Sequence, residues 1–222
     1  MTPEPHIAVP TQTVDPRTIC LGIPSKTSPD VLMANGLANI IGTGRLANQP
    51  LWKYGGSNVA AVRMTIVHEF LKTQCEWLMM LDDDICFTVL DWDLLWEDHG
   101  GEWAVCAEYL QKIPNQIVPA RWGLGFTRVH RLVFEKLNQL STEDGQPFVR
   151  QGFYCGELMY DYFPQGINSA GEYRQEDHGF WMLVRLAQVP TRYERRTRLG
   201  HAGRMVWKYD AAEVDADDGG GQ

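Results

Sequence analysis

Long hydrophobic runs are absent from this 222-residue chain, since no stretch approaches the roughly 20 apolar residues that a membrane-spanning helix requires. The N-terminal stretch also lacks the basic region and the apolar region of a secretory signal peptide. Cysteine is scarce, with 5 residues and no Cys-x-x-Cys pair, and most of them lie in apolar surroundings. We therefore expect a cytoplasmic protein without a membrane span, whose thiols are reduced and buried.

Basic residues are too few for a general nucleic-acid-binding protein, because 20 Lys and Arg are outweighed by 28 Asp and Glu, for a net charge of -8. Acidic residues gather at 210–222, in DAAEVDADDGGGQ, which is predicted to be a disordered tail. Arginines gather at 191–204, in TRYERRTRLGHAGR, where Glu194 is the single acid. This basic segment is either a solvated surface or an anion-binding site.

One domain is predicted, because a chain of this length that is 44% hydrophobic can bury one sizeable core. Residues 1–17 are rich in Pro and Thr and are predicted to be a flexible lead. The domain is predicted to span residues 18–209, and the acidic tail follows at 210–222.

Strands are predicted to alternate with helices along this domain. The strands are expected at 18–24, 76–81 and 102–110, and the helices at 28–41, 57–72, 91–98, 129–140 and 176–189. Ser28 is a candidate N-cap with Pro29 at the first helical position, and Ser57 or Asn58 could cap the second helix. This alternation favours an α/β fold, with helices on both faces of a sheet and ligands bound outside the carboxyl ends of the strands.

Three consecutive aspartates, Asp82, Asp83 and Asp84, follow the predicted buried strand EWLMML. Two carboxylates about 6 Å apart repel each other by roughly 0.7 kcal/mol in water and by more in a protein, so a nearby cation is expected to offset the repulsion. In an extended segment, Asp82 and Asp84 would project to one face and Asp83 to the other. The pattern indicates either a divalent cation held by Asp82 and Asp84 or a surface turn, since Asp also favours turns.

The segment EWLMMLDDDICF (76–87) resembles the Asp-x-Asp segment of GT-A glycosyltransferases, which transfer sugars from nucleotide-sugar donors. Other segments resemble the family in the expected order, namely SNVAAVR (57–63), GLGFTRVHRLVFEKL (123–137), QEDHGFWMLVR (175–185) and LGHAG (199–203). The resemblance covers residues 18–208 and implies a single GT-A-like, Rossmann-related α/β domain, with a mixed, mostly parallel sheet and helices on both faces. The chain departs from the family before the His segment, where a glycine that the family often carries is missing.

The resemblance implies a metal site and a donor site. Asp84 would ligate Mn²⁺ or Mg²⁺ with His201 as a second ligand, and Asp82 would contact the nucleotide ribose or reach the metal through water. A UDP- or GDP-sugar would be bound by Pro24, Ser25, Arg63, Asp82, Asp83, Gly123, Gly125, Arg198 and Arg204.

Asp177 is the candidate general base, which would take the proton of the acceptor hydroxyl in an inverting transfer. The alternative is a capping function, because Glu176 and Asp177 occupy the first turn of a predicted helix. Trp122, Tyr154 and Trp181 could stack on a sugar ring or an acceptor, or simply pack in the core.

The predicted function is metal-dependent transfer of a sugar from a nucleoside-diphosphate sugar to a hydroxyl acceptor. One alternative is a nucleotidyltransferase, but the segment after the first strand, GIPSKTSPD (22–30), holds only Lys26 where a Gly-rich basic loop would be expected. Another is a non-catalytic module that binds nucleotide-sugars or glycans. Small members of the GT-A family occur in bacteria and bacteriophages, so the acceptor is open among glycans, proteins and hydroxymethylated DNA bases. A bacteriophage-encoded chain would work in the cytoplasm of the host.

Overall fold

The computed structural model describes residues 14–25, 28–55, 58–110, 119–120, 122–154, 156–167 and 171–202. Within these ranges the helices are η1 (Pro16–Thr18, a 3-10 helix), α1 (Val31–Gly42), α2 (Val59–Lys72), α3 (Val89–Trp96), α4 (Arg131–Asn138) and α5 (Glu176–Leu186). No helix of the described residues is long and apolar enough to cross a bilayer. The predicted acidic tail and most of the predicted lead lie outside the described residues.

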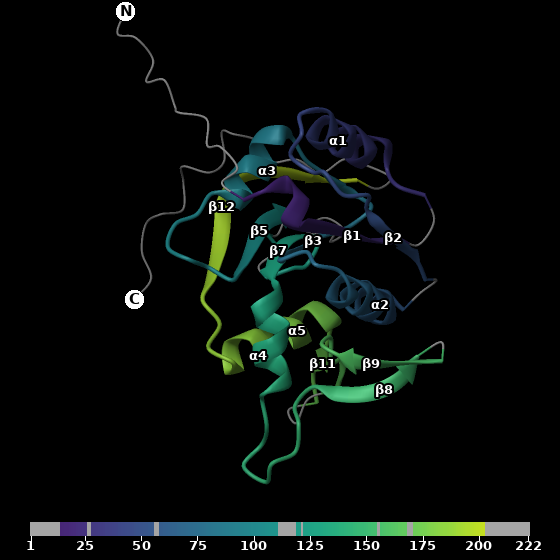
Figure 1. Ribbon diagram of the computed structural model, residues 1–222, viewed down its shortest axis with the longest axis vertical. Coiled ribbons are helices and arrows are strands. Elements are labelled where there is room, and N and C mark those ends of the chain that lie inside the picture. Colours follow the sequence, from purple (N-terminus) through teal and green to yellow (C-terminus); the bar gives the residue numbers. More distant parts are fainter. Residues whose placement is uncertain are drawn as a thin grey trace, which may run out of the picture.

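Among the described residues, eight strands form one central mixed sheet (Figure 1). The order is β2 (Leu51–Tyr54), β1 (Ile19–Ser25), β3 (Trp77–Leu81), β7 (Phe126–His130), β5 (Ala104–Leu110), β12 (Thr191–His201) and β4 (Ile85–Cys86), and β6 (Pro119–Ala120) pairs with β5. Strands β2, β1, β3, β5 and β12 run in one direction, whereas β7, β4 and β6 run in the other. This mixed, mostly parallel sheet confirms the predicted fold class. Smaller hairpins are formed by β8 (Arg150–Tyr154) with β9 (Glu157–Asp161) and by β10 (Gly166–Ile167) with β11 (Tyr173–Arg174).

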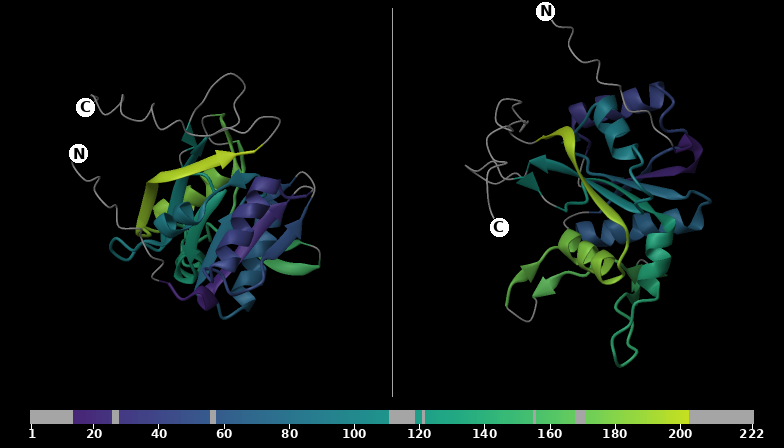
Figure 2. Two further views of the ribbon diagram at one scale, coloured as in Figure 1. Left: turned by 90° about the horizontal axis from the view of Figure 1, so that it is seen from above. Right: turned by 90° about the vertical axis from the view of Figure 1, so that its left-hand side faces the viewer.

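Helices cover both faces of the sheet (Figures 1 and 2). Helices α1 and α3 pack on one face, and α2, α4 and α5 pack on the other. Strand β3 shows how the sequence directs this packing, because Leu78 and Met80 face the α2 layer while Met79 and Leu81 face the α1 layer. None of these four side chains is more than 1% exposed, so β3 is buried on both faces and reads as a continuous apolar run.

The described cysteines are free thiols. Cys20, Cys86 and Cys106 are buried and Cys75 is partly buried, whereas Cys155 lies outside the described residues. Burial raises the pKa of the Cys20 and Cys106 thiols to about 12, so both stay protonated at neutral pH.

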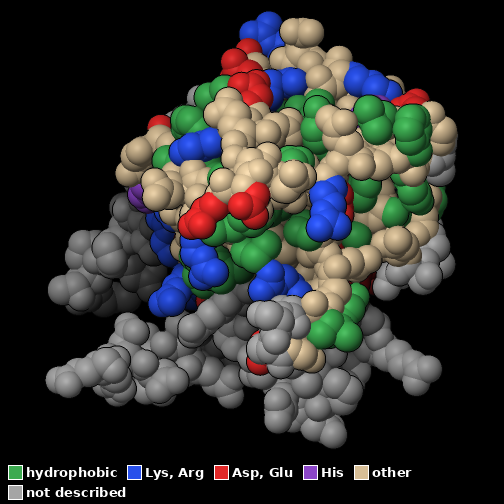
Figure 3. All heavy atoms as spheres, turned by 90° about the horizontal axis from the view of Figure 1, so that it is seen from below, with side chains coloured by type: hydrophobic (Ala, Val, Ile, Leu, Met, Phe, Trp, Pro, Cys, Tyr) green, Lys and Arg blue, Asp and Glu red, His purple; other side chains and the backbone are tan. Residues whose placement is uncertain are grey.

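Basic side chains are scattered over the face of the molecule that is seen from below (Figure 3). On the described part of this face, Lys and Arg lie in separate groups among hydrophobic and uncharged side chains, with acidic side chains between some of them. The described part of the face therefore presents no continuous basic surface, in keeping with the net charge of -8.

The caps of two helices test the predicted helix starts. The N-cap of α1 is Asp30, whose carboxylate accepts a hydrogen bond from the N–H of Leu32 at 2.8 Å. The prediction of Ser28 as cap was therefore wrong, and Pro29 precedes the helix, because only Asp30 is close enough to reach an unpaired N–H of the first turn. Helix α2 is capped by Asn58, as one of the two predicted alternatives.

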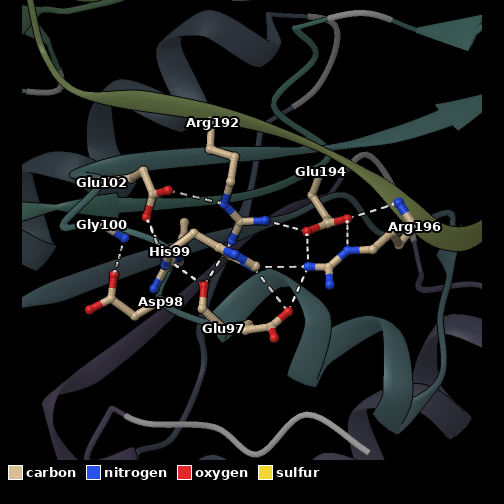
Figure 4. A network of polar contacts seen from close by, with 9 residues as sticks. Glu97, Asp98, His99, Gly100, Glu102, Arg192, Glu194 and Arg196 are labelled. Atoms are coloured by element: carbon tan, nitrogen blue, oxygen red, sulfur yellow. Dashed lines mark hydrogen bonds and ion pairs between the residues drawn. The ribbon is translucent and has the colours of Figure 1, made fainter. Parts of the chain in front are cut away.

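Strand β12 was not predicted, because charged residues dominate its sequence. Two of its arginines form ion pairs within the fold, since Arg192 contacts Glu102 and Glu194, while Arg196 contacts Glu194 and Glu97 (Figure 4). Glu194 is 2% exposed, and although burial raises its pKa, hydrogen bonds from Arg196 hold that pKa below its usual value. Arg192 and Arg196 thus attach β12 to the loop after α3, with the Arg192 side chain mostly buried and the Arg196 side chain about half exposed.

Replacing Gly179 of α5 with Ala is expected to destabilise the fold. Alanine normally favours a helix over glycine, but a Cβ at this position would lie 1.9 Å from the backbone oxygen of Pro164. Overlap with backbone should lower the free energy of unfolding by roughly 2–3 kcal/mol, measured by urea denaturation. Gly152→Ala on exposed β8 is the matched control, because its Cβ would meet no atom within 4 Å. Equal stability of the two variants would contradict this account of Gly179.

Candidate active site

Asp82, Asp83 and Asp84 form a turn directly after β3 instead of the extended segment that the sequence suggested. A hydrogen bond from the N–H of Ile85 to the carbonyl of Asp82, at 3.2 Å, closes the turn. Because strand geometry ends at Leu81, the alternation of side chains ends there too, and all three aspartates line one cavity of about 200 Å³. The prediction that Asp83 points away from its neighbours was therefore wrong.

The cavity lies at the carboxyl ends of three neighbouring parallel strands. Pro24 and Ser25 end β1, Gly55 follows β2, and the aspartates follow β3. This is the edge at which open α/β sheets bind their ligands. The complete lining is Pro24, Ser25, Gly55, Val59, Val62, Arg63, Asp82, Asp83, Asp84 and Glu176. Several segments that are distant in sequence thus bring together most of the residues that were predicted to bind donor or metal.

Arg63, on α2, provides a positive charge that offsets the repulsion among the aspartates. Its Nη2 lies 2.8 Å from Oδ1 of Asp82, and its Nε lies 3.9 Å from Oε1 of Glu176. Arg63 is only 3% exposed, so water screens these charge pairs weakly. Burial raises the pKa of Asp82, an effect that Arg63 opposes and the neighbouring Asp84 reinforces.

Asp83 connects the turn to the first strand and the first helix. The hydroxyl of Ser25 donates to Oδ2 of Asp83 at 2.5 Å, and the N–H of Asp30 donates to the carbonyl of Asp83 at 2.8 Å. Two donor-site predictions, Ser25 and Asp83, are therefore in direct contact.

His201 reaches the aspartate turn because the last described strand returns to it. Strand β12 pairs antiparallel with β4, which places His201 opposite Ile85. The N–H of Ala202 donates to the carbonyl of Asp84 at 2.7 Å, and Nε2 of His201 lies 3.2 Å from Oδ1 of Asp84. The structure thus joins two predicted metal ligands that are far apart in sequence.

The side chains themselves indicate how well a divalent cation would fit. Asp84 and His201 offer an oxygen and a nitrogen, which Mn²⁺ accepts readily and Mg²⁺ accepts in part. Asp82 instead accepts a hydrogen bond from Arg63. Its position fits a ribose contact or a water-mediated contact better than direct ligation. Asp84 and His201 are therefore the pair that fits a metal.

A group of three residues with possible metal-ligand atoms lies outside the cavity, between α2 and β9. Ligand atoms of His68, Glu69 and Glu157 all lie within 4.8 Å of one another. However, Nζ of Lys72 lies 3.1 Å from Glu69 and 3.0 Å from Glu157. Because Lys72 already balances these acids, we interpret the group as an ion-pair cluster.

The predicted glycine loop, residues 123–125, is tied to the aspartate turn. The carbonyl of Gly125 accepts a hydrogen bond from the N–H of Asp82 at 2.9 Å. The carbonyl of Gly123 accepts hydrogen bonds from Thr127 Oγ1 at 3.0 Å and from Trp181 Nε1 at 3.4 Å. These contacts fix the loop between the turn and helix α5.

Glu176 was assigned no more than a capping function from the sequence, yet it is the acid of α5 that lines the cavity. Its side chain is 16% exposed, and burial raises its pKa while Arg63 opposes the rise. Asp177, the predicted base, is half-buried beside it and accepts a hydrogen bond from the N–H of His178 at 2.7 Å. In the sequence, the only indication that Glu176 lines the cavity was its position next to Asp177 in the first turn of the predicted helix.

The described arginines of the basic segment do not line the cavity. The backbone N–H of Arg198 donates to Asp91, and its guanidinium donates to the carbonyls of Arg195 and Thr197, each at 3.3 Å. Arg204 lies outside the described residues. Contact of Arg198 and Arg204 with a diphosphate therefore stays a prediction.

Comparisons with known proteins show a shared fold and give no evidence on the chemistry of the site. The structure is similar to one titled "Crystal Structure of A197 from STIV", with a TM-score of 0.51 and 14% identity over 86% of this chain and 94% of that chain. This likeness shows a shared α/β fold. A glycosyltransferase involved in the glycosylation of the major capsid of PBCV-1 is matched at a TM-score of 0.32 and 13% identity, over 54% of this chain and 68% of that chain, which is too distant to carry an argument. No protein-family model and no curated protein matches the sequence.

Proposed function

We propose that this chain is a metal-dependent glycosyltransferase, working in the cytoplasm, that moves a sugar from a UDP- or GDP-sugar to a hydroxyl acceptor. The supporting observation is the joining of Asp84 with His201 beside the Asp82–Arg63 pair, at the carboxyl edge of the sheet. These residues come from separate parts of the chain, and a purely structural turn would not require their convergence.

Asp84 and His201 would hold Mn²⁺ or Mg²⁺ in this proposal. When bound, the cation would stabilise the negative charge that develops on the departing nucleoside diphosphate. Asp82, oriented by Arg63, would accept hydrogen bonds from the ribose hydroxyls. Pro24, Ser25 and Gly55 line the part of the cavity formed by the ends of β1 and β2 and would contact the nucleoside.

Asp177 would take the proton of the acceptor hydroxyl as it attacks the sugar. Glu176, which lies within 3.9 Å of Arg63, would hold that arginine toward the donor. The acceptor is a glycan, a protein or a hydroxymethylated DNA base.

Nucleotide-sugar hydrolysis is expected to stop when EDTA removes divalent cations and to return when Mn²⁺ is added in excess. The assay incubates the full chain with UDP-glucose, UDP-N-acetylglucosamine, UDP-galactose or GDP-mannose and measures the nucleoside diphosphate released. Equal turnover with and without EDTA would reject the metal. Binding of a donor without any turnover, across acceptor trials that include hydroxymethylated DNA, would identify a binding module in place of an enzyme.

A further inference from the structure

A second, larger hollow lies on the other side of α5 from the aspartate cavity. It encloses about 920 Å³, within the range of small-molecule sites. Its walls come from α5, β11 and the start of β12, and they include Trp122, Tyr173, Arg174, His178, Trp181 and Arg185. We call this hollow the α5 groove.

An exposed aromatic ring forms part of the α5 groove. Trp122 is 37% exposed, although Trp181 meets it edge-on at 5.0 Å between centroids and Tyr193 lies beside it at 5.5 Å. Its φ of 63° is in the left-handed region, which a bulky side chain rarely adopts. The fold thus holds a partly exposed indole in a backbone conformation that a bulky residue rarely adopts, and this exposed ring is available to a ligand in the groove.

The polar side chains of the α5 groove are mixed in charge. The lining includes the bases Arg174 and Arg185 and the acid Glu172. It also includes neutral hydrogen-bonding groups from Gln188 and Thr191. A nucleic-acid strand would favour a continuous basic surface, whereas this lining mixes its arginines with an acid and uncharged groups. Mixed donors and acceptors around an open indole suit a neutral, hydroxyl-rich ring.

The α5 groove and the aspartate cavity share two walls. In the first turn of α5, Glu176 lines the cavity and His178 lines the groove, with Asp177 between them. In the loop before β7, Trp122 lines the groove, and three residues later the carbonyl of Gly125 is bonded to Asp82. A ligand in the groove would therefore lie next to the predicted base.

We propose that the α5 groove binds a carbohydrate, with a sugar ring stacked on Trp122, and that this carbohydrate is the acceptor. The acceptor role rests on the proposed glycosyltransferase function. The stacking itself does not, because it depends on groove residues alone.

The test measures binding of defined oligosaccharides to the full chain by calorimetry. The probes are maltohexaose, cellohexaose, chitohexaose and mannohexaose, with the oligonucleotide dT12 as a nucleic-acid probe. At least one oligosaccharide should bind, and Trp122→Leu should weaken it at least roughly tenfold, as loss of a central Trp contact does. Trp122→Phe keeps a ring and should retain binding within about threefold. The control Phe153→Leu removes an aromatic that is 81% exposed on β8 and should change nothing.

Several results would overturn the proposal. They are no binding by any oligosaccharide, binding that Trp122→Leu leaves unchanged, and Trp122-dependent binding of dT12 alone. Oligosaccharide binding without nucleotide-sugar turnover would reject the glycosyltransferase function and the acceptor role while the carbohydrate site stands. Nucleotide-sugar turnover without oligosaccharide binding would reject the carbohydrate site in the α5 groove, while the glycosyltransferase function stands.

Discussion

Asp84→Asn is expected to lower nucleotide-sugar turnover in Mn²⁺ on the order of 100- to 1,000-fold, the loss that follows when one preorganised electrostatic contact is removed from an active site. Asparagine keeps the size of the side chain but removes the charge that faces Nε2 of His201 at 3.2 Å. The backbone contact from Ala202 to the carbonyl of Asp84 should persist, so the fold should be retained. Turnover is measured beside the melting temperature of the same sample.

Two further variants test whether the loss of turnover is specific to the charge of Asp84. Asp144→Asn removes an equal charge from an exposed loop residue and should leave turnover unchanged. Asp83→Asn removes a charge from the same turn but leaves the Asp84–His201 pair intact, so its loss should be smaller than that of Asp84→Asn. If Asp83→Asn and Asp84→Asn lose the same activity, the site responds to total charge, and Asp84 is not a specific ligand.

The fold was predictable where the signal is local. Strand β3 is an uninterrupted apolar run, and α2 carries a cap and helically spaced apolar residues, so short windows of sequence were sufficient. Strand β12 was not, because its charged residues are accommodated by strand pairing and ion pairs with residues distant in the chain. Arg196 and Glu97 are 99 positions apart, and no window of sequence shows that they meet.

Part of the candidate site could be predicted from the sequence, and part could not. The resemblance to GT-A enzymes brought attention to Asp82, Asp84 and His201, and the structure places Asp84 and His201 in contact. The direction of Asp83 could not be predicted, because it depends on where β3 ends. A shift of strand end by one or two residues changes which face a side chain occupies. Glu176 was overlooked for a related reason, since its place in the cavity is marked by its contact with Arg63, which is far away in sequence.

Asp177→Asn is expected to lower sugar transfer on the order of 100- to 10,000-fold while donor affinity stays the same. Asparagine keeps the size and can still accept the hydrogen bond from the N–H of His178, but it cannot take a proton. Asp177 lies in the first turn of α5, after the N-cap Gln175, so if it only stabilised the helix dipole the change would cost about 0.3–1 kcal/mol of stability and leave the transfer rate unchanged. Donor affinity by calorimetry and transfer rate are measured on the same protein.

Glu176→Gln is the matched variant one residue earlier, and it should have the opposite pattern. Glu176 faces Arg63 in the aspartate cavity, the proposed donor site, so losing its charge should weaken donor binding, while transfer at saturating donor should fall less than in Asp177→Asn. A large loss of transfer in Glu176→Gln with unchanged donor affinity, together with a silent Asp177→Asn, would assign the proton transfer to Glu176. The raised pKa of Glu176, caused by burial, would suit that role, because a carboxylate with a higher pKa is a stronger base. The pair of variants therefore decides which of two adjacent acids performs the chemistry and which one positions the donor.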